Sequence, residues 1–261
     1  MSPTNAGNTN HSRAQGSLDS RYKDIYDKEA ATYDQTRFGS ISWGYAKQIK
    51  NDLIIQLLRE NNYLNSEAML LDAASGTGRI AHDLVRSGMQ HVHAADISTE
   101  MLLKSKENLD PALHDCMTWT ETNMKELPFE DDLFDVATLG SFLYLIPLDE
   151  YANYLADIRR VLKPGGLLIC EVSNTFCLAN PKNALVVLTQ KYLRRRKVKS
   201  YVTPWGLKNL FSGFVIDEVI GVEYPMISRD YDKCRRLNFR VGRSPLLRYL
   251  GGKIVLVLRK Q

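Results

Sequence analysis

Cysteine and histidine are scarce in this chain of 261 residues, and neither forms a cluster. The four cysteines, Cys116, Cys170, Cys177 and Cys234, contain no C-x-x-C pair, and the five histidines are scattered without metal-ligand spacing. We therefore expect no metal site and no disulfide framework. The cysteines are predicted to be reduced thiols in a cytoplasmic protein.

Long apolar segments are also missing. No run reaches the roughly 18 residues that a membrane-spanning helix needs, and the N-terminus lacks the apolar core of a signal peptide. Residues 1–17 are rich in Ser, Thr, Asn and Gly, so we expect a disordered tail. Residues 18–261 are predicted to form one domain, and no membrane span is expected.

Positive charge is concentrated in the last third of the chain. From Lys182 to Gln261 there are 18 Lys and Arg against 5 Asp and Glu, with the densest cluster at 191–199. Much of this charge falls in two predicted insertions, residues 176–205 and 224–252. A cationic cap over an active site would favour an anionic substrate. The alternatives to such a cap are a solvated basic face without a specific partner and a surface that binds nucleic acid or membrane.

The chain is organised around residues 69–84, which read MLLDAASGTGRIAHDL. An apolar run ends at Asp72, small residues and glycines follow, and a helical pattern starts near Ile80. The order is strand, tight turn, helix. Gly76 and Gly78 let the backbone turn sharply, and the first turn of the helix offers free N–H groups to a nucleotide-like ligand.

Two cofactors compete for this loop. Residues 76–81 fit the G-x-G-x-x-G/A dinucleotide fingerprint, with an acid about twenty residues further on. S-adenosylmethionine (SAM) is the second candidate. A carboxylate at Asp72, just before the glycines, suits a ligand with an ammonium and a sulfonium charge and would repel a pyrophosphate. Asp72 therefore favours SAM, although an NAD-dependent oxidoreductase stays a distant alternative.

Further motifs follow in order. The strand at 91–96 ends in Asp96, where a carboxylate can accept hydrogen bonds from ribose hydroxyls, and Ser98 is a predicted N-cap for a helix that carries Met101. The segments TNM (122–124), LPFEDD (127–132), FDVATL (134–139) and IRRVLKPGGLLI (158–169) come next. In this order, over residues 33–171, they resemble the class I SAM-dependent methyltransferases of the small-molecule branch (methyltransferase type 11, UbiE-like).

The resemblance implies SAM as cofactor, S-adenosylhomocysteine as product, and a set of cofactor-binding residues. They are Tyr33, Arg37, Asp72, Ala74, Ser75, Gly76, Gly78, Asp96, Ile97, Met101, Asn123, Met124 and Gly140. Tyr33 and Arg37 occupy positions from which relatives reach the SAM carboxylate; a surface helix packed by its tyrosines is the alternative. Ala74 departs from the family, which has a glycine there, and we expect only a slight change in the loop.

The predicted fold is α/β: a Rossmann-like, doubly wound, seven-stranded and mostly parallel sheet, with an N-terminal helical lid and C-terminal insertions. Residues 18–65 form the lid, in which 45–63 is an amphipathic helix. The strands are expected near 69–72, 92–95, 117–121, 134–139, 167–172, 214–223 and 253–259. In the resembling family, the last two strands are antiparallel and close the sheet.

The candidates for substrate contact are Tyr144 and Glu171, which follow or end strands four and five. Relatives often carry a histidine where Tyr144 stands. A phenol with a pKa near 10 is a poor base at neutral pH, so an aromatic wall of the pocket is the more probable role. Because methyl transfer is a displacement from a sulfonium, positioning of the two reactants can supply most of the rate.

We therefore predict an enzyme that transfers a methyl group from SAM to a small-molecule acceptor, at O or N, in the biosynthesis of a specialised metabolite. The [DNS]-P-P-[FYW] signature of amide and adenine methylation is absent, and no nucleic-acid partner is expected. An RNA methyltransferase using the basic C-terminal third and a catalytically silent SAM-binding module stay open as alternatives. The oligomeric state is not predicted.

Overall fold

The computed structural model describes residues 9–38, 41–177, 200–224 and 230–261. Its helices are α1 Thr9–Glu29, α2 Tyr33–Phe38, α3 Ile41–Glu60, α4 Arg79–Arg86, α5 Thr99–Asn108, α6 Tyr151–Val161, α8 Leu207–Leu210 and α9 Tyr231–Gly242. Its strands are β1 Met69–Ala73, β2 His91–Asp96, β3 Met117–Glu121, β4 Phe134–Leu139, β5 Leu162–Asn174, β6 Tyr201–Val202, β7 Phe214–Val222 and β8 Lys253–Lys260.

The strands form one sheet in the order β3-β2-β1-β4-β5-β8-β7, with the short β6 paired to β5. Strands β1 to β5 are parallel to one another, whereas β8 runs antiparallel to both β5 and β7. The predicted doubly wound, mostly parallel sheet is confirmed, and all seven predicted strands are present. The strand that was not predicted, β6, is two residues long, too short to show an alternating pattern.

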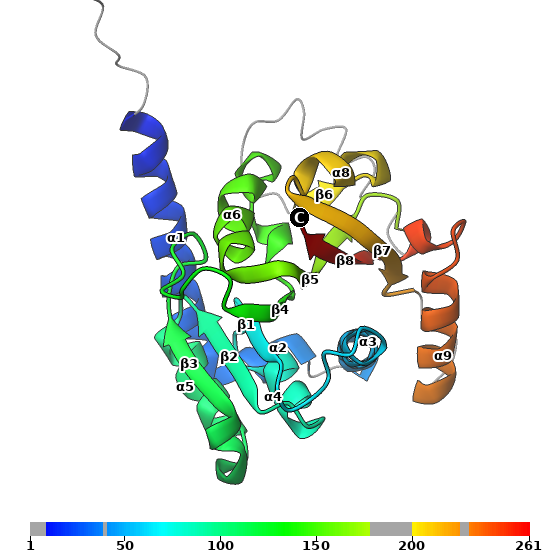
Figure 1. Ribbon diagram of the computed structural model, residues 1–261, viewed down its shortest axis with the longest axis horizontal. Helices are drawn as coiled ribbons and strands as arrows, with labels where there is room; N and C mark the ends of the chain where they lie inside the picture. Colours follow the sequence, from blue (N-terminus) through cyan, green and yellow to red (C-terminus); the bar gives the residue numbers. More distant parts are fainter. Residues whose placement is uncertain (1–8, 39–40, 178–199, 225–229) are drawn as a thin grey trace, which may run out of the picture.

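Helices cover both faces of this sheet and create two cores (Figure 1). One core joins α6 and α8 to the side chains of one strand face, among them Leu71, Ala137 and Leu168. The other joins α3, α4 and α5 to the opposite face, which includes Leu70 and Val136. Because successive strand residues point to opposite faces, Asp72 shares the α3 face with Leu70.

The N-terminal region differs from the prediction. Helix α1 begins at Thr9, so residues 9–17 are helical where a disordered tail was expected; residues 1–8 of that tail lie outside the described residues. Once a helix is nucleated, each further residue costs little, and Ala14 and Gln15 are good helix formers. The composition of residues 1–17 could not show this continuation, because it depends on the helix that follows.

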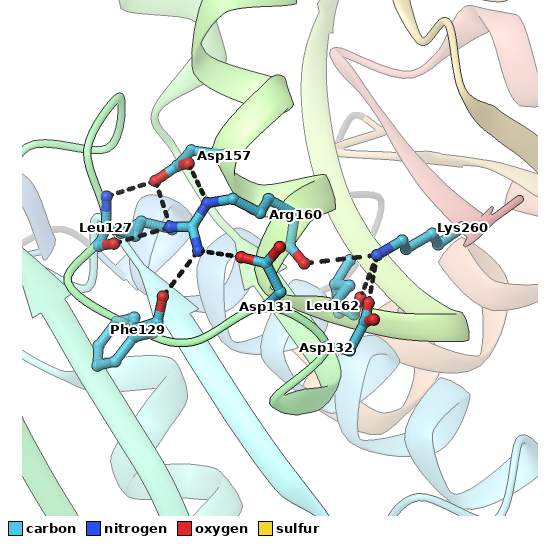
Figure 2. Close-up of polar contacts among 8 residues, drawn as sticks. All are labelled: Leu127, Phe129, Asp131, Asp132, Asp157, Arg160, Leu162 and Lys260. Carbon is cyan, nitrogen blue, oxygen red and sulfur yellow. Dashed lines mark hydrogen bonds and ion pairs between the residues drawn. The ribbon is translucent and has the colours of Figure 1, made fainter.

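An arginine on α6 holds the loop that leads into β4 (Figure 2). The Arg160 guanidinium donates to both carboxylate oxygens of Asp157, at 2.6 and 3.0 Å, and to Asp131 at 2.8 Å. It also donates to the carbonyls of Leu127 and Phe129, at 2.8 and 2.7 Å. Five hydrogen bonds from one side chain therefore hold residues 127–131 in place, the segment that follows the turn at 122–124.

Candidate active site

A pocket with about 1090 Å³ of empty volume opens at the carboxyl ends of β1, β2 and β4, the place where doubly wound sheets bind ligands. Helices α1, α2 and α3 complete its wall. Its lining residues are Asp19, Tyr22, Tyr26, Tyr33, Lys47, Lys50, Asn51, Asp72, Ala74, Ser75, Thr77, Arg79, Ile80, Asp96, Ile97, Met101, Asn123, Met124, Gly140, Ser141, Phe142, Leu145, Ile146 and Tyr154.

The turn between β1 and α4 is held by backbone hydrogen bonds. The Ser75 N–H donates to the Ala95 carbonyl at 3.0 Å, and the Gly78 N–H donates to the Ser75 carbonyl at 3.0 Å. Gly78 has φ +78°, and a Cβ there would lie 2.1 Å from the Ser105 hydroxyl and 2.5 Å from His82 Nε2. Gly78 therefore lets α4 and α5 pack closely; it does not face the pocket.

Asp96, at the end of β2, is buried and holds the turn in place. Its Oδ2 accepts from the Gly76 N–H at 2.8 Å and its Oδ1 from the Ser98 N–H at 2.9 Å. Burial raises the pKa of this carboxyl although these backbone hydrogen bonds oppose the shift. Each oxygen keeps a lone pair, so Asp96 can still accept hydrogen bonds from a ligand in the pocket.

Asp72, at the end of β1, leaves one oxygen without a partner in the described part of the chain. The Thr138 hydroxyl donates to Oδ1 at 2.7 Å, whereas Oδ2 is buried without a hydrogen bond, as is the nearby Ser75 hydroxyl. Burial raises the Asp72 pKa to about 7. An unpaired buried carboxylate oxygen is costly, and a ligand ammonium on this pocket wall would satisfy it.

A family model described as a methyltransferase domain matches residues 70–166, which hold β1 to β4 and these carboxylates. A ubiquinone/menaquinone biosynthesis C-methyltransferase of Bartonella tribocorum is 32% identical over 154 residues, 58% of this chain and 57% of that protein. Its counterpart in Brucella canis is 42% identical over 103 residues. Residues 70–166 match a methyltransferase domain, and this part of the chain belongs to the class I SAM-dependent methyltransferases. The Brucella match spans 38% of each protein.

Solved structures agree on the methyltransferase fold. Magnesium protoporphyrin IX methyltransferase from Synechocystis, with S-adenosylhomocysteine bound, gives a TM-score of 0.65 at 14% identity and covers 94% of this chain and 100% of its own. A methyltransferase from Thermotoga maritima gives 0.63 at 17% identity, covering 91% and 99%. Both likenesses extend well beyond residues 70–166, so the α1–α3 region and the β7–β8 pair also belong to the shared architecture.

Ten of the predicted cofactor residues line the pocket. They are Tyr33, Asp72, Ala74, Ser75, Asp96, Ile97, Met101, Asn123, Met124 and Gly140. Gly76 contributes its N–H to Asp96, and Gly78 packs against α5, so neither lines the pocket. Ala74, where relatives have glycine, has φ +52°, the left-handed conformation that a glycine adopts without strain.

Three further predicted residues, Arg37, Tyr144 and Glu171, are not among those that line the pocket, and their roles stay predictions. Arg37 donates to Glu29 at 2.9 Å and stacks on the Tyr33 ring at 5.5 Å, so its charge is already paired. Tyr144 lies under the Lys253 ammonium, 4.5 Å from the ring centroid, and burial raises its pKa further above neutral. Glu171 is 2% exposed and separated from the pocket by Ser141.

Helix α1 crosses the pocket and is tied to both of its sides. Asp19 accepts from Asn123 at 3.0 Å and from the Tyr154 hydroxyl at 2.7 Å. Lys23 donates to the Ile97 carbonyl at 3.0 Å, and Tyr22 donates to the Leu145 carbonyl at 3.0 Å. These contacts were not predicted, because they join α1 to loops and to α6, about 70 to 135 residues away.

Lys47 and Lys50 line the pocket but were missed from the sequence. The sequence does contain a signal for them. Lys50 precedes Leu53 and Ile54 by three and four residues, so a charged side chain stands on the buried stripe of α3. Lys50 is only 3% exposed, and a lysine that deeply buried needs an anionic partner.

The described part of the basic C-terminal third does not cap the pocket. In α9, Arg235 pairs with Asp52 of α3 at 3.7 Å, and Arg243 pairs with Glu60 of α3 and with Glu218 of β7, the latter at 3.2 Å. Figure 1 shows α9 (orange) at the end of the molecule opposite α1 (blue). The densest basic cluster, 191–199, lies outside the described residues.

Two absences apply to the described ranges. They hold no group of three or more His, Cys, Asp and Glu side chains placed to bind a metal ion. They also hold no helix that combines the length and the apolar character needed to cross a membrane.

Proposed function

We propose that this chain transfers a methyl group from SAM to a small-molecule acceptor. The observation that carries the proposal is the pair of buried carboxylates on neighbouring strands, Asp72 and Asp96, at the two sides of one glycine turn. Asp72 has an oxygen without a partner in the described chain, and Asp96 has lone pairs directed at the same pocket wall. This donor set suits a cationic amino-acid group at Asp72 and a diol at Asp96.

In this proposal, each part of the cofactor meets matching chemistry. Ile97 and Met124 supply apolar contacts for the adenine, and Asn123 supplies an amide at its edge. Asp96 accepts from the ribose hydroxyls. Asp72 and the turn at 75–78 hold the amino-acid part, where the Ser75 hydroxyl is another buried group without a partner in the described chain. Gly140 leaves room beside the Ile80 side chain, which a Cβ would approach to 2.7 Å.

When bound, SAM supplies an electrophilic methyl group on a sulfonium. The chain's contribution is positioning. The wall that the acceptor would face is formed beyond β4 by Gly140, Ser141, Phe142, Leu145 and Ile146. Neither Tyr144 nor Glu171 is suited to remove a proton at neutral pH. The Tyr144 pKa is raised by burial, and the lysines around Glu171 hold its pKa well below the ordinary value. We infer that the acceptor arrives as a competent nucleophile or is ionised by binding.

A small-molecule acceptor is favoured over RNA. The pocket is enclosed by α1, and Arg235 of α9 and Arg243 just after it are paired with acids of α3 and β7. The relatives from Bartonella and Brucella are named as C-methyltransferases of quinone biosynthesis, which makes carbon a candidate acceptor atom beside the oxygen or nitrogen predicted from the sequence. A role in specialised metabolism stays a prediction.

The site assignment is tested with Asp96→Asn and S-adenosylhomocysteine. We expect the affinity, measured by calorimetry, to fall about tenfold or more. The neutral amide that replaces the carboxylate is a weaker acceptor for the two hydrogen bonds from the ribose hydroxyls. Asp115→Asn, an exposed position in the 3₁₀ turn before β3, is the matched control. Thermal unfolding shows that both variants are folded. Wild-type affinity in Asp96→Asn would contradict the assignment.

A further inference from the structure

Three lysines converge on one carboxylate beside the pocket. Glu171, on the α3 face of β5, pairs through Oε2 with Lys50 Nζ at 2.7 Å and through Oε1 with Lys253 Nζ at 2.7 Å. The side chains of Glu171, Lys50 and Lys253 are only 2%, 4% and 12% exposed. Two ammonium groups therefore already neutralise Glu171 before the third lysine is considered.

The third lysine, Lys47, stands one helical turn before Lys50 and lines the pocket. Its Nζ donates to the Ser141 hydroxyl at 3.1 Å, and Lys50 donates to the same oxygen at 3.2 Å. The Ser141 hydroxyl in turn donates to Glu171 at 2.9 Å. Ser141 is therefore fully engaged, and it is held at φ +55°, a strained conformation of the kind found at functional sites.

Lys47 has donors to spare in the described chain. An ammonium has three N–H donors; one is used on Ser141, and no described carboxylate lies within 4 Å of Nζ. Burial and the neighbouring Lys50 lower its pKa to about 8, opposed by Glu171 and Glu223. Lys253 also faces it from β8. A cation in such surroundings gains most from an anionic partner in the pocket.

We propose that Lys47, held in place by Ser141, forms a subsite for an anionic oxygen of the methyl acceptor, a carboxylate or an ionised hydroxyl. This rests on the proposed function and specifies its substrate class. Lys47 supplies the charge. Ser141 and Lys50 fix the position of its ammonium, and Glu171 anchors the group from behind. The ammonium would lower the pKa of a phenolic or enolic acceptor held this way, so that the acceptor releases its proton to solvent on binding and becomes the nucleophile without a separate base.

The position of Lys47 favours the acceptor over the cofactor's own carboxylate. The groups that act on the charge of Lys47 lie on α3, on β5, and around β7 and β8. Asp72, beside the turn that would hold the amino-acid part, interacts with Lys50 and Asp96. Lys47 therefore lies towards the β5–β8 side of the pocket, past Ser141, where the transferred methyl group would be directed.

The test uses the full chain loaded with S-adenosylhomocysteine and titrated with benzoate, its neutral counterpart benzamide, and 4-nitrophenol. We compare wild type, Lys47→Met and Lys47→Arg, with Lys104→Met on α5, an exposed lysine paired with Glu107, as matched control. Calorimetry gives each affinity, and the phenolate absorbance reports ionisation of bound 4-nitrophenol. Affinities for S-adenosylhomocysteine and for 5′-methylthioadenosine, which lacks the amino-acid group, are measured in parallel.

We expect wild type and Lys104→Met to bind benzoate or 4-nitrophenolate at least about tenfold more tightly than benzamide. Lys47→Met should lose that preference for the anion, and Lys47→Arg should keep most of it. Affinity for S-adenosylhomocysteine stays within about twofold throughout. An anion preference that is absent in wild type, or kept in Lys47→Met, overturns the proposal. The proposal is also overturned if Lys47→Met binds S-adenosylhomocysteine more weakly but binds methylthioadenosine as wild type does, because this result assigns the lysine to the cofactor carboxylate. A wild-type chain that binds no S-adenosylhomocysteine contradicts the proposed function itself.

Discussion

Asp72 and Asp96 show what single residues of this sequence reveal. Each ends an apolar strand, so their convergence at one sheet edge follows from the parallel topology and was predicted. Lys47 and Lys50 were missed because their environment is set by Glu171 and Ser141, about 90 to 120 residues away. Gly78 was predicted to meet the ligand, yet the space it leaves is taken by Ser105 and His82. Local pattern locates a turn, and only the tertiary contacts decide which way its glycines face.

The raised pKa of Asp72 predicts how cofactor binding depends on pH. In the unliganded chain the carboxyl has a pKa of about 7, above its ordinary value, because burial disfavours the charge. A ligand ammonium binds the ionised form. We expect affinity for S-adenosylhomocysteine to rise about fivefold to tenfold between pH 6 and pH 7.5, as measured by calorimetry. As the pH rises from about 4 to about 7, the free energy of unfolding of the unliganded chain should fall. The reason is that ionising Asp72 costs free energy only in the folded state.

Asp72→Asn is the control for this pH dependence. The amide has nearly the same shape and does not titrate, so the variant should bind more weakly with an almost flat profile below pH 7.5. If Asp72→Asn kept the same slope as wild type, a different group would be responsible and Asp72 would not face the ammonium.

At the scale of elements, the strands were predictable and the ties between elements were not. All seven predicted strands are present, because each is an apolar or alternating segment bounded by turns or helices. Helix α1 was foreseen as a lid only by resemblance, and its actual attachment uses Asp19, Tyr22 and Lys23. Those side chains look like an ordinary polar helix face in the sequence.

Asp19 provides a direct test of the lid. Its carboxylate accepts from Asn123, Lys125 and Tyr154 and so ties α1 to the far side of the pocket. Asp19→Asn should speed hydrogen exchange in residues 19–29 and increase the dissociation rate of S-adenosylhomocysteine several-fold. Asp24→Asn, on the exposed face of the same helix, is the control and should match wild type. Unchanged exchange in Asp19→Asn would show that α1 is held by other contacts.

Arg160 tests the loop that carries the predicted adenine contacts. Lysine keeps the charge but cannot make the five directed hydrogen bonds of the guanidinium in Figure 2. We expect Arg160→Lys to lower the free energy of unfolding by about 1–3 kcal/mol, measured by denaturant titration. Arg159→Lys, at the neighbouring exposed position, should change it by less than about 0.5 kcal/mol. Equal effects in the two variants would contradict the bracing role.

At the scale of the whole molecule, the order of the motifs was sufficient for the topology. Alternating strands and helices with a final strand pair predict a doubly wound sheet, and that sheet places its pocket at the strand ends. The ion-pair partners of the basic C-terminal third were not predictable. The partners of Arg235 and Arg243 include Asp52 and Glu60, on a helix about 180 residues earlier, and no local pattern connects them. The predicted cytoplasmic location stays a prediction.

The central claim is methyl transfer to a small molecule, and one measurement tests it most directly. The purified chain is incubated with methyl-deuterated SAM and a metabolite extract, and the products are analysed by mass spectrometry. We predict a small molecule that gains a trideuteromethyl group, with fragmentation showing whether carbon, oxygen or nitrogen carries it, and less of this product with Asp96→Asn when SAM is below saturation. Label found only in RNA or protein, or no label although S-adenosylhomocysteine binds, would contradict the account.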